Sequence, residues 1–145
     1  MDTSAEISIQ KWFGNDESSV QDYVAVEEPL EIWLKTYNAA DQSESQPLIT
    51  TMRTPGDDVA LVKGWILSSG LVNEAEIQSI EPTGTNHLKG YASNRVLITL
   101  LPGVSANPLA MQRSEYVNSS CGVCGQQSIE YLLDSLPEQH SGHGA

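Results

Sequence analysis

Two cysteines, Cys121 and Cys124, are the residues whose type and spacing most directly suggest chemistry in this sequence. They stand two residues apart in the segment SSCGVCG at 119–125. The glycines allow a ligand to approach the backbone closely, and the dipole of a helix starting just after the segment would stabilise a thiolate. Because the thiolate is the reactive form of cysteine, the pair could serve metal, redox or nucleophilic chemistry.

Four interpretations of this pair remain open from spacing alone. A thioredoxin-like dithiol normally follows a strand, whereas polar residues precede Cys121 here. A zinc site could combine the pair with His140 and His143, but only two residues separate these histidines, where a zinc finger needs about three to five. Two buried thiols would suit a less polar segment. A reactive carrier of a single sulfur atom fits best, and a zinc-stabilised or partner-binding module with a structural CxxC is the alternative; Arg113 could add positive charge nearby.

The elements that must position this segment are a mixture of strands and helices. Apolar residues that alternate with acids indicate a strand over 23–34, in which Pro29 favours an edge strand or a bulge. Short apolar or β-branched runs predict three more strands. The further strands are expected over 48–54, 77–80 and 95–101, and helices over 54–70 and 128–136. The fold class is therefore α+β or α/β.

The helix over 54–70 has the clearest boundaries. Thr54 can cap it and Pro55 suits its first position, while Gly70 can end it in a left-handed conformation. Four apolar side chains share one stripe, and the tryptophan among them is most simply a core residue. The stripe consists of Leu61, Val62, Trp65 and Ile66.

Other charged residues have both structural and functional interpretations. Glu27 and Glu28 could form a carboxylate pair, but neighbours on a strand point to opposite faces, which favours a solvated edge and a turn. Asp57 and Asp58 suit a helix start better than a metal site. Arg53 could face an anionic ligand at that helix start, and a structural ion pair explains it equally well.

The overall charge excludes some partners. Nineteen acids and seven bases give a net charge of -12 and a pI near 4.4, which disfavours nucleic acid and anionic membranes as partners. Residues 1–58 hold twelve of the acids and three of the bases. No apolar run approaches a membrane span, and the start lacks the pattern of a signal peptide, so we expect a cytoplasmic protein. Composition predicts an acidic mobile tail over 1–19, one domain over 20–136, and a tail or truncation point over 137–145.

Three blocks, in order, resemble the signature blocks of the formate dehydrogenase accessory sulfurtransferase family (FdhD type). They are VEEPLEI at 26–32, MRTPGDD at 52–58 with the helix that carries Gly64 and Gly70, and SSCGVCG at 119–125. The resemblance covers about residues 20–133. Arg113 and the segment NRVLI at 94–98 also lie where that family carries similar residues.

This resemblance implies a cytoplasmic sulfur carrier. Such proteins take sulfur from a pyridoxal-phosphate cysteine desulfurase and pass it to the molybdenum (or tungsten) bis-guanine-dinucleotide cofactor of formate dehydrogenase. Cys121 matches the cysteine that forms the persulfide, and Cys124 matches its companion. The implied fold is a cytidine deaminase-like mixed sheet with flanking helices. We find no His-x-Glu pair of the kind that deaminases use, so we expect no metal ligated by the protein itself.

The family's later segments, of the Gly-Gly-x-His and Glu-Asp-x-Gly-Arg-His-Asn types, have no counterpart in this sequence. The length therefore predicts that the chain corresponds to the N-terminal half of such a protein, with an incomplete fold. The main cofactor site is expected in the other half, which leaves Arg53 as the candidate cofactor-binding residue here. The partners implied are a cysteine desulfurase, formate dehydrogenase and the molybdenum cofactor, and a homodimer is compatible with the resemblance.

Overall fold

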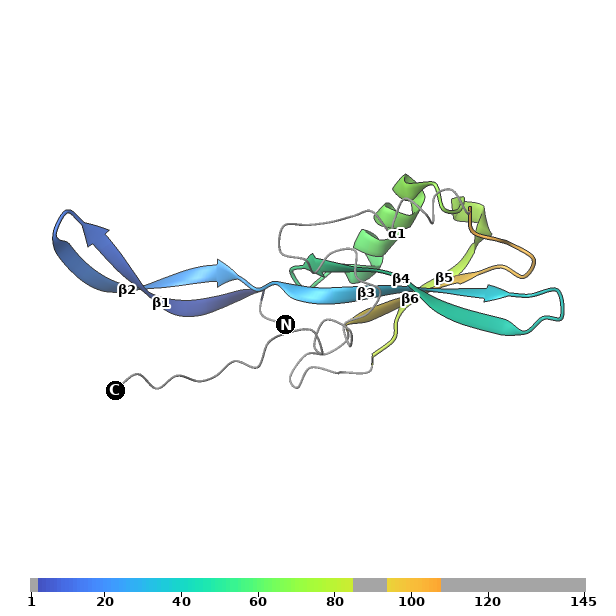
Figure 1. The fold of residues 1–145 in the computed structure, drawn as a ribbon, viewed down its shortest axis with the longest axis horizontal. Coiled ribbons are helices and arrows are strands. Elements are labelled where there is room, and N and C mark those ends of the chain that lie inside the picture. Colours follow the sequence, from blue (N-terminus) through green and yellow to red (C-terminus); the bar gives the residue numbers. More distant parts are fainter. Residues whose placement is uncertain (1–2, 85–93, 108–145) are drawn as a thin grey trace.

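The computed structural model describes residues 3–84 and 94–107 of the chain (Figure 1). Within these ranges most residues are in strands, with one α-helix and one short 3-10 turn. The elements are β1 (Ser4–Phe13), β2 (Asp16–Ala25), β3 (Glu28–Tyr37), β4 (Ser43–Arg53), α1 (Asp58–Ser69), the 3-10 turn η1 (Glu74–Glu76), β5 (Ile77–Pro82) and β6 (Arg95–Leu100). No helix among the described residues has the length and apolar character needed to cross a bilayer.

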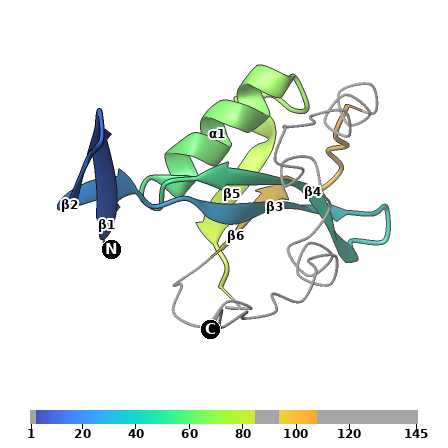
Figure 2. The same ribbon diagram turned by 60° about the vertical axis from the view of Figure 1, so that its left-hand side comes forward.

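Four of the strands form a mixed sheet that helix α1 covers on one face (Figure 2). Their order is β4-β3-β6-β5, with β3 antiparallel to β4 and parallel to β6, and β5 antiparallel to β6. This arrangement confirms the expected mixed α+β class. The expected helix over 128–136 lies outside the described residues.

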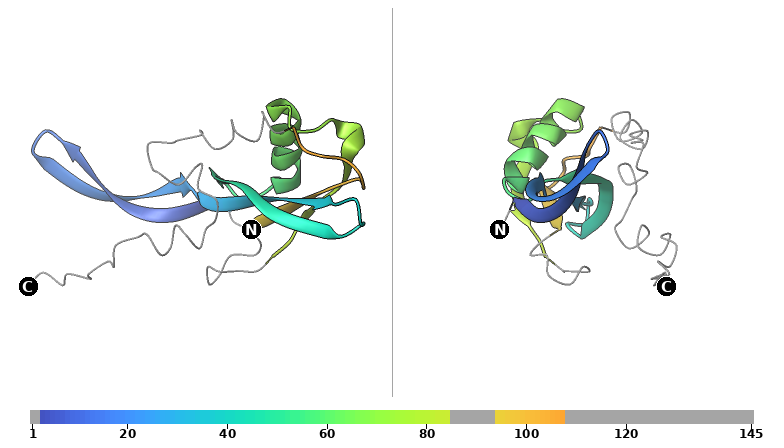
Figure 3. Two further views of the ribbon diagram at one scale, coloured as in Figure 1. Left: turned by 45° about the vertical axis from the view of Figure 1, so that its right-hand side comes forward. Right: turned by 90° about the vertical axis from the view of Figure 1, so that its left-hand side faces the viewer.

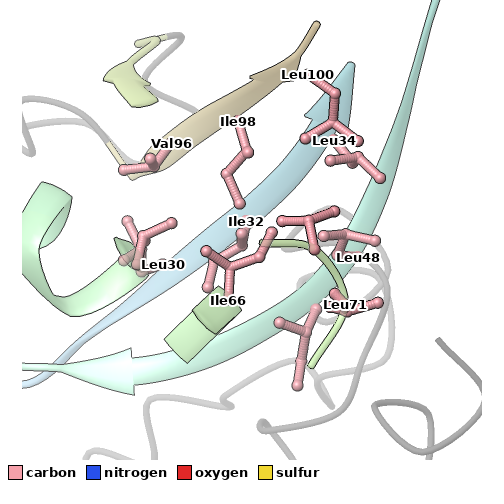
Figure 4. Close-up of a cluster of buried hydrophobic side chains, with 12 residues drawn as sticks. Leu30, Ile32, Leu34, Leu48, Ile66, Leu71, Val96, Ile98 and Leu100 are labelled. Carbon is pink, nitrogen blue, oxygen red and sulfur yellow. The ribbon is translucent and has the colours of Figure 1, made fainter. Parts of the chain in front are cut away.

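The core lies between α1 and the sheet (Figure 4). Alternate residues of β3 point toward the helix, as a period of two requires, and Leu30, Ile32 and Leu34 are at most 1% exposed. Helix α1 contributes Val62 and Ile66 to the same core. The other members of this core among the described residues are Leu48, Ile49, Leu71, Val72, Val96, Ile98 and Leu100.

Helix α1 ends where the sequence predicts but begins later. Gly70 closes the helix with a φ of 70°, in the left-handed region that favours glycine. The first helical residue is Asp58, so the prediction of a start at Thr54 and Pro55 is wrong. Pro55 is instead a fully buried side chain ahead of the helix. The buried stripe is also narrower than predicted, because Leu61 is 41% exposed while Trp65 packs against the core in a partly buried position.

Strand β3 lies inside the sheet, so the prediction of an edge strand from Pro29 is wrong, although a bulge does interrupt its pairing with β4 after Ile32. Pairing with β6 begins only at Glu31, whose backbone N–H donates to the carbonyl of Asn94 at 2.8 Å. Backbone N–H groups two residues apart point to the same side of a strand. The nitrogen of Pro29, which has no hydrogen to donate, therefore points to the side of β3 on which β6 lies, but at a level that β6 does not reach.

Residues 4–25, assigned by composition mainly to a mobile tail over 1–19, form a two-stranded antiparallel hairpin, β1–β2. We call this hairpin the arm, because it extends away from the four-stranded sheet (Figure 3). Paired strands therefore stand where composition predicted a mobile tail. The strands alternate in polarity, and the two-residue turn between Phe13 and Asp16 is Gly14-Asn15, with a φ of 63° at Gly14. Gly-Asn between alternating strands is a recognised hairpin signal.

Candidate functional site

Most of the residues singled out for chemistry lie outside the described ranges. This applies to Cys121 and Cys124, and to Arg113, His140 and His143 of the alternative interpretations. Arg53 and the acidic pairs lie within them. Among residues 3–84 and 94–107, no group of three or more potential metal-ligating side chains occurs.

Arg53 is buried at the junction of β3, β4 and α1. Its Nε donates to Asp58 Oδ1 at 2.8 Å and its Nη2 to Asp58 Oδ2 at 3.0 Å, which makes a two-pronged pair with the first residue of the helix. Its Nη1 contacts Glu28 Oε2 at 3.3 Å across the β3–β4 pair. The Arg53 side chain is 2% exposed, so these contacts support the structural ion-pair interpretation rather than contact with an anionic ligand.

The acidic pairs divide between the same cluster and solvent. Glu27 is exposed while Glu28 is buried, so the two carboxylates do not act together, as the alternation along a strand implies. The expectation that both are solvated is wrong for Glu28, because Arg53 supplies a buried partner. Asp57 is the N-cap residue of α1 and Asp58 lies in its first turn, as expected for a helix start.

An open pocket of about 510 Å³ lies beside the start of α1. Its charged wall residues are Asp57, Asp58 and Lys63, and Lys63 is already paired with Glu74 at 2.6 Å. This contact lowers the pKa of Glu74, first through the hydrogen bond from Lys63 and then through its positive charge. The pocket is lined by Gly56, Asp57, Asp58, Val59, Ala60, Lys63 and Pro82. Its mixture of charges does not single out one class of ligand.

A second buried charge cluster, which sequence reasoning missed, lies on the sheet face opposite α1. Glu31 Oε2 accepts from Arg95 Nη2 at 2.7 Å, from Arg95 Nε at 2.8 Å and from Trp33 Nε1 at 3.1 Å. The Arg95 guanidinium also stacks 4.1 Å from the centre of the Trp33 ring. Glu31 is 1% exposed, and the hydroxyl of its strand neighbour Thr50 is buried without a hydrogen-bond partner. Because Arg95 lies 64 residues from Glu31, no local pattern could have indicated this cluster.

Comparison with known proteins gives a consistent result over part of the chain. The chain is 37% identical over 115 residues to the sulfur carrier protein FdhD of Streptomyces avermitilis, a match that covers 78% of this chain and 38% of that protein. It is 39% identical over 119 residues to the FdhD protein of Corynebacterium efficiens, covering 78% and 40%. The FdhD protein of Anaeromyxobacter dehalogenans is 34% identical over 122 residues, covering 81% and 39%.

Two further comparisons give no match. No protein-family profile matches the chain, and no solved structure matches it. The cytidine deaminase-like fold expected from the resemblance is therefore not supported by a similar solved structure. The chain spans about two fifths of the length of the curated relatives that it matches. The resemblance found in the three sequence blocks is nevertheless confirmed: in sequence, this chain is a relative of the FdhD sulfur carrier proteins, over a part of their length.

Proposed function

We propose that this chain is the cysteine-bearing part of a sulfur carrier that acts as a sulfurtransferase in the cytoplasm. Sulfur is taken from a cysteine desulfurase and delivered to the molybdenum bis-guanine-dinucleotide cofactor, which is here a substrate, before formate dehydrogenase becomes active. The observation that carries the proposal is 34–39% identity to proteins named as sulfur carriers over about four fifths of the chain. The CxxC segment supplies the thiols that such a role requires.

In the loading step, Cys121 is the nucleophile. Its thiolate attacks the terminal sulfur of the desulfurase persulfide, so that a new S–S bond forms on Cys121 as the donor's S–S bond breaks. The donor cysteine leaves as a thiolate, and the proton of the persulfide stays with the transferred sulfur. One neutral sulfur atom moves in this exchange, and no outside oxidant is needed.

In the unloading step, Cys124 has two chemically distinct roles open to it. As a relay, its thiolate takes the terminal sulfur from Cys121 and presents it in turn to the acceptor. As a discharging thiol, it attacks the Cys121 sulfur, forms a Cys121–Cys124 disulfide and releases the carried atom as sulfide. The dithiol then supplies the two electrons that reduce the sulfur, and a thiol reductant must reopen the disulfide before another cycle.

The loading step is tested by intact mass after incubation with a cysteine desulfurase and cysteine. We expect the wild-type chain to gain one sulfur atom, and dithiothreitol to remove it. Cys121→Ala should lose this gain, while the matched variant Cys124→Ala should keep it. If Cys124→Ala loses the sulfur and Cys121→Ala keeps it, the assignment is reversed, and if the wild type never gains it, the carrier role of this chain fails.

The delivery step is tested separately with radiolabelled sulfur on Cys121. The loaded chain is mixed with formate dehydrogenase that holds the cofactor without its sulfur ligand, and the label is followed to the enzyme. Transfer to the cofactor with recovery of formate oxidation supports delivery by this chain. Retention of the label on Cys121 would mean that delivery needs protein beyond this chain, and it would refute the proposed delivery step for the chain alone.

A further inference from the structure

Strand β5 is at one edge of the four-stranded sheet, because β6 is its only partner among the described strands. Just after β5, the N–H of Thr83 donates to the carbonyl of Arg95 at 2.8 Å. Since N–H groups two residues apart point to the same side of a strand, those at positions 79 and 81 also point toward β6. The backbone N–H and carbonyl of Ile80 therefore point away from the sheet. An edge strand that presents such groups is a template for pairing with another extended segment.

A groove lies between this edge strand and helix α1. It consists of two adjoining pockets of about 290 and 510 Å³, which share Val59 and Lys63 as walls. We call it the β5 groove. Val59 is 38% exposed, and Ile77 and Ile80 are only partly buried, so an incoming apolar side chain would have apolar surface to cover. The apolar walls are Val59 and Ala60 of α1 with Ile77, Ile80 and Pro82 of β5.

A strand added to β5 would place alternate side chains in the β5 groove. Ile80 pairs with Ile98, and Pro82 pairs with Val96, and both partners belong to the core under α1. Directly paired residues share a face of the sheet. Side chains opposite Ile80 and opposite Pro82 would therefore both point to the α1 side, the first beside Val59 and the second beside the start of α1.

The charges along the β5 groove distinguish its two ends. At the start of α1, Asp57 is exposed and makes no capping hydrogen bond, while Asp58 is held by Arg53. At the other end, Lys63 is already neutralised by Glu74. These charges alone do not select a class of ligand. Beside a sheet edge, however, they favour a strand that carries a positive charge at the Asp57 end.

We propose that the edge of β5 and the β5 groove bind an extended segment of another protein, paired antiparallel to β5, with an apolar residue opposite Ile80 and an arginine two positions earlier. Antiparallel pairing is the slightly more stable ladder, and it places the earlier residues of the segment toward Pro82 and Asp57. The arginine then meets the exposed carboxylate of Asp57. Because Pro82 has no N–H to donate, the pairing centres on Ile80.

The net charge of the chain favours the same kind of partner. A protein with a net charge of -12 attracts basic segments over a longer range than the groove itself. The binding is independent of the proposed sulfur transfer, because it uses neither Cys121 nor Cys124. A chain that fails to carry sulfur could therefore still bind the segment, and the two proposals can fail separately.

NMR of the full ¹⁵N-labelled chain, with a reductant present, tests the backbone pairing. The probe is the acetylated and amidated peptide Ser-Arg-Thr-Val-Thr-Val-Ser, whose first valine is placed opposite Ile80. We expect a Kd of about 0.1–1 mM, because a short peptide covers less than the ~800 Å² per partner of a standard interface. Saturating peptide should slow hydrogen exchange of the Ile80 amide at least about tenfold.

A matched peptide separates backbone pairing from side-chain contacts. The same peptide with a methyl group on the nitrogen of the first valine keeps every side chain but cannot donate to the Ile80 carbonyl. We expect it to bind at least about tenfold more weakly. Equal binding of the two peptides, or no binding of the first at several millimolar, overturns the proposal. An Ile80 amide that is already protected in the free chain also overturns it, because residues of the chain itself would then cover the edge.

Variants of the chain test the groove and its charged end. Val59→Ser should weaken binding at least about threefold, whereas the matched control Leu61→Ser, at an exposed apolar residue of α1 outside the groove walls, should not. Asp57→Asn should weaken the arginine peptide about two- to fivefold and leave unchanged a peptide with glutamine in place of arginine. Glu81→Gln makes the same charge change on the opposite face of β5 and should have no effect.

The variants also define what would contradict the placement. Equal effects of Val59→Ser and Leu61→Ser would overturn binding in the β5 groove. Equal effects of Asp57→Asn and Glu81→Gln, or tighter binding of the glutamine peptide, would overturn the position of the arginine. Circular dichroism of each variant confirms that its strands and helix are intact.

Discussion

Substitution of Arg53 by methionine is expected to destabilise the protein strongly. Arg53 is 2% exposed and lies between Glu28 and Asp58, whose side chains are 8% and 17% exposed. Methionine retains an unbranched apolar side chain but removes the charge and every hydrogen-bond donor. Two carboxylates would then remain at the junction of β3, β4 and α1 without this cation.

The expected magnitude follows from the burial of the cluster. Breaking a buried ion pair by removal of one partner costs about 3–5 kcal/mol, whereas an exposed pair contributes about 0–1 kcal/mol. Two of the three contacts are short, at 2.8 and 3.0 Å, and the third is 3.3 Å. Since Asp58 keeps some access to water, we expect a loss near the lower end, about 3 kcal/mol.

The assay is urea unfolding of the ligand-free chain, followed by tryptophan fluorescence and by circular dichroism. The matched control is Lys63→Met, which makes the same change in net charge and side-chain type at an exposed ion pair with Glu74. We expect the control to unfold like the wild type. A loss of less than about 1 kcal/mol for Arg53→Met, equal to the control, would refute the buried-cluster reasoning. That result would favour the alternative in which Arg53 serves to bind an anionic ligand.

Three further predictions concern the glycines of α1, the Lys63–Glu74 ion pair and the core. Gly70→Ala should lower the free energy of unfolding in urea by about 1 kcal/mol, because Gly70 has a φ of 70°. Gly64→Ala, inside α1, should instead raise it by up to about 1 kcal/mol, because alanine favours the helix. An added Cβ meets nothing within 4 Å at either position, so the two variants differ in backbone conformation and not in steric clashes. Lys63→Met should raise the pKa of Glu74 toward its ordinary value, as measured by an NMR titration of the Glu74 carboxyl carbon. In the wild type, the contribution of this ion pair to stability is present at neutral pH and disappears as the pH falls through the lowered pKa of Glu74. Ile98→Ala should cost about 2–5 kcal/mol, because the side chain is fully buried, and a smaller loss would mean that the core closes around the cavity.

Short-range patterns predicted the elements of the four-stranded sheet well. The alternation around Ile32 and the β-branched run that follows it both became strands, and the left-handed end of α1 at Gly70 was also correct. These features depend on period and on a single backbone conformation, which neighbouring residues determine. Sequence patterns therefore predicted correctly those features that interactions between neighbouring residues determine.

The errors arose where local signals competed. Thr54 and Pro55 make a good helix start, but Pro55 is buried ahead of α1 and the first turn begins at Asp58, which pairs with Arg53. Over the arm, acidic and polar composition outweighed the turn signal of Gly14-Asn15, which correctly marks a hairpin. At the start of α1, tertiary packing decided the boundary. In the arm, the local turn signal was correct, but the polar composition pointed to a different structure.

The candidate site was predictable only in part. The CxxC segment is visible in the sequence because its chemistry depends on residue type and spacing, and its geometry lies outside the described residues. For Arg53, the sequence left a ligand contact and an ion pair equally open. One partner, Asp58, is five residues away, but the other, Glu28, is 25 residues away and becomes a neighbour only through the pairing of β3 with β4.

The acids of β3 show how the few basic residues of this chain help to define its fold. The direct cross-strand partner of Glu28 is Arg53 on β4, and that of Glu31 is Arg95 on β6. Because residues three apart on a strand lie on opposite faces, one ion pair lies on the face covered by α1 and the other on the opposite face. A slip of β3 by one residue against either neighbour would leave a buried carboxylate opposite an uncharged residue, which costs several kcal/mol. Two of only seven basic residues thus favour one register on both sides of β3, so Glu28, which suggested a solvated edge, instead helps to hold this strand inside the sheet.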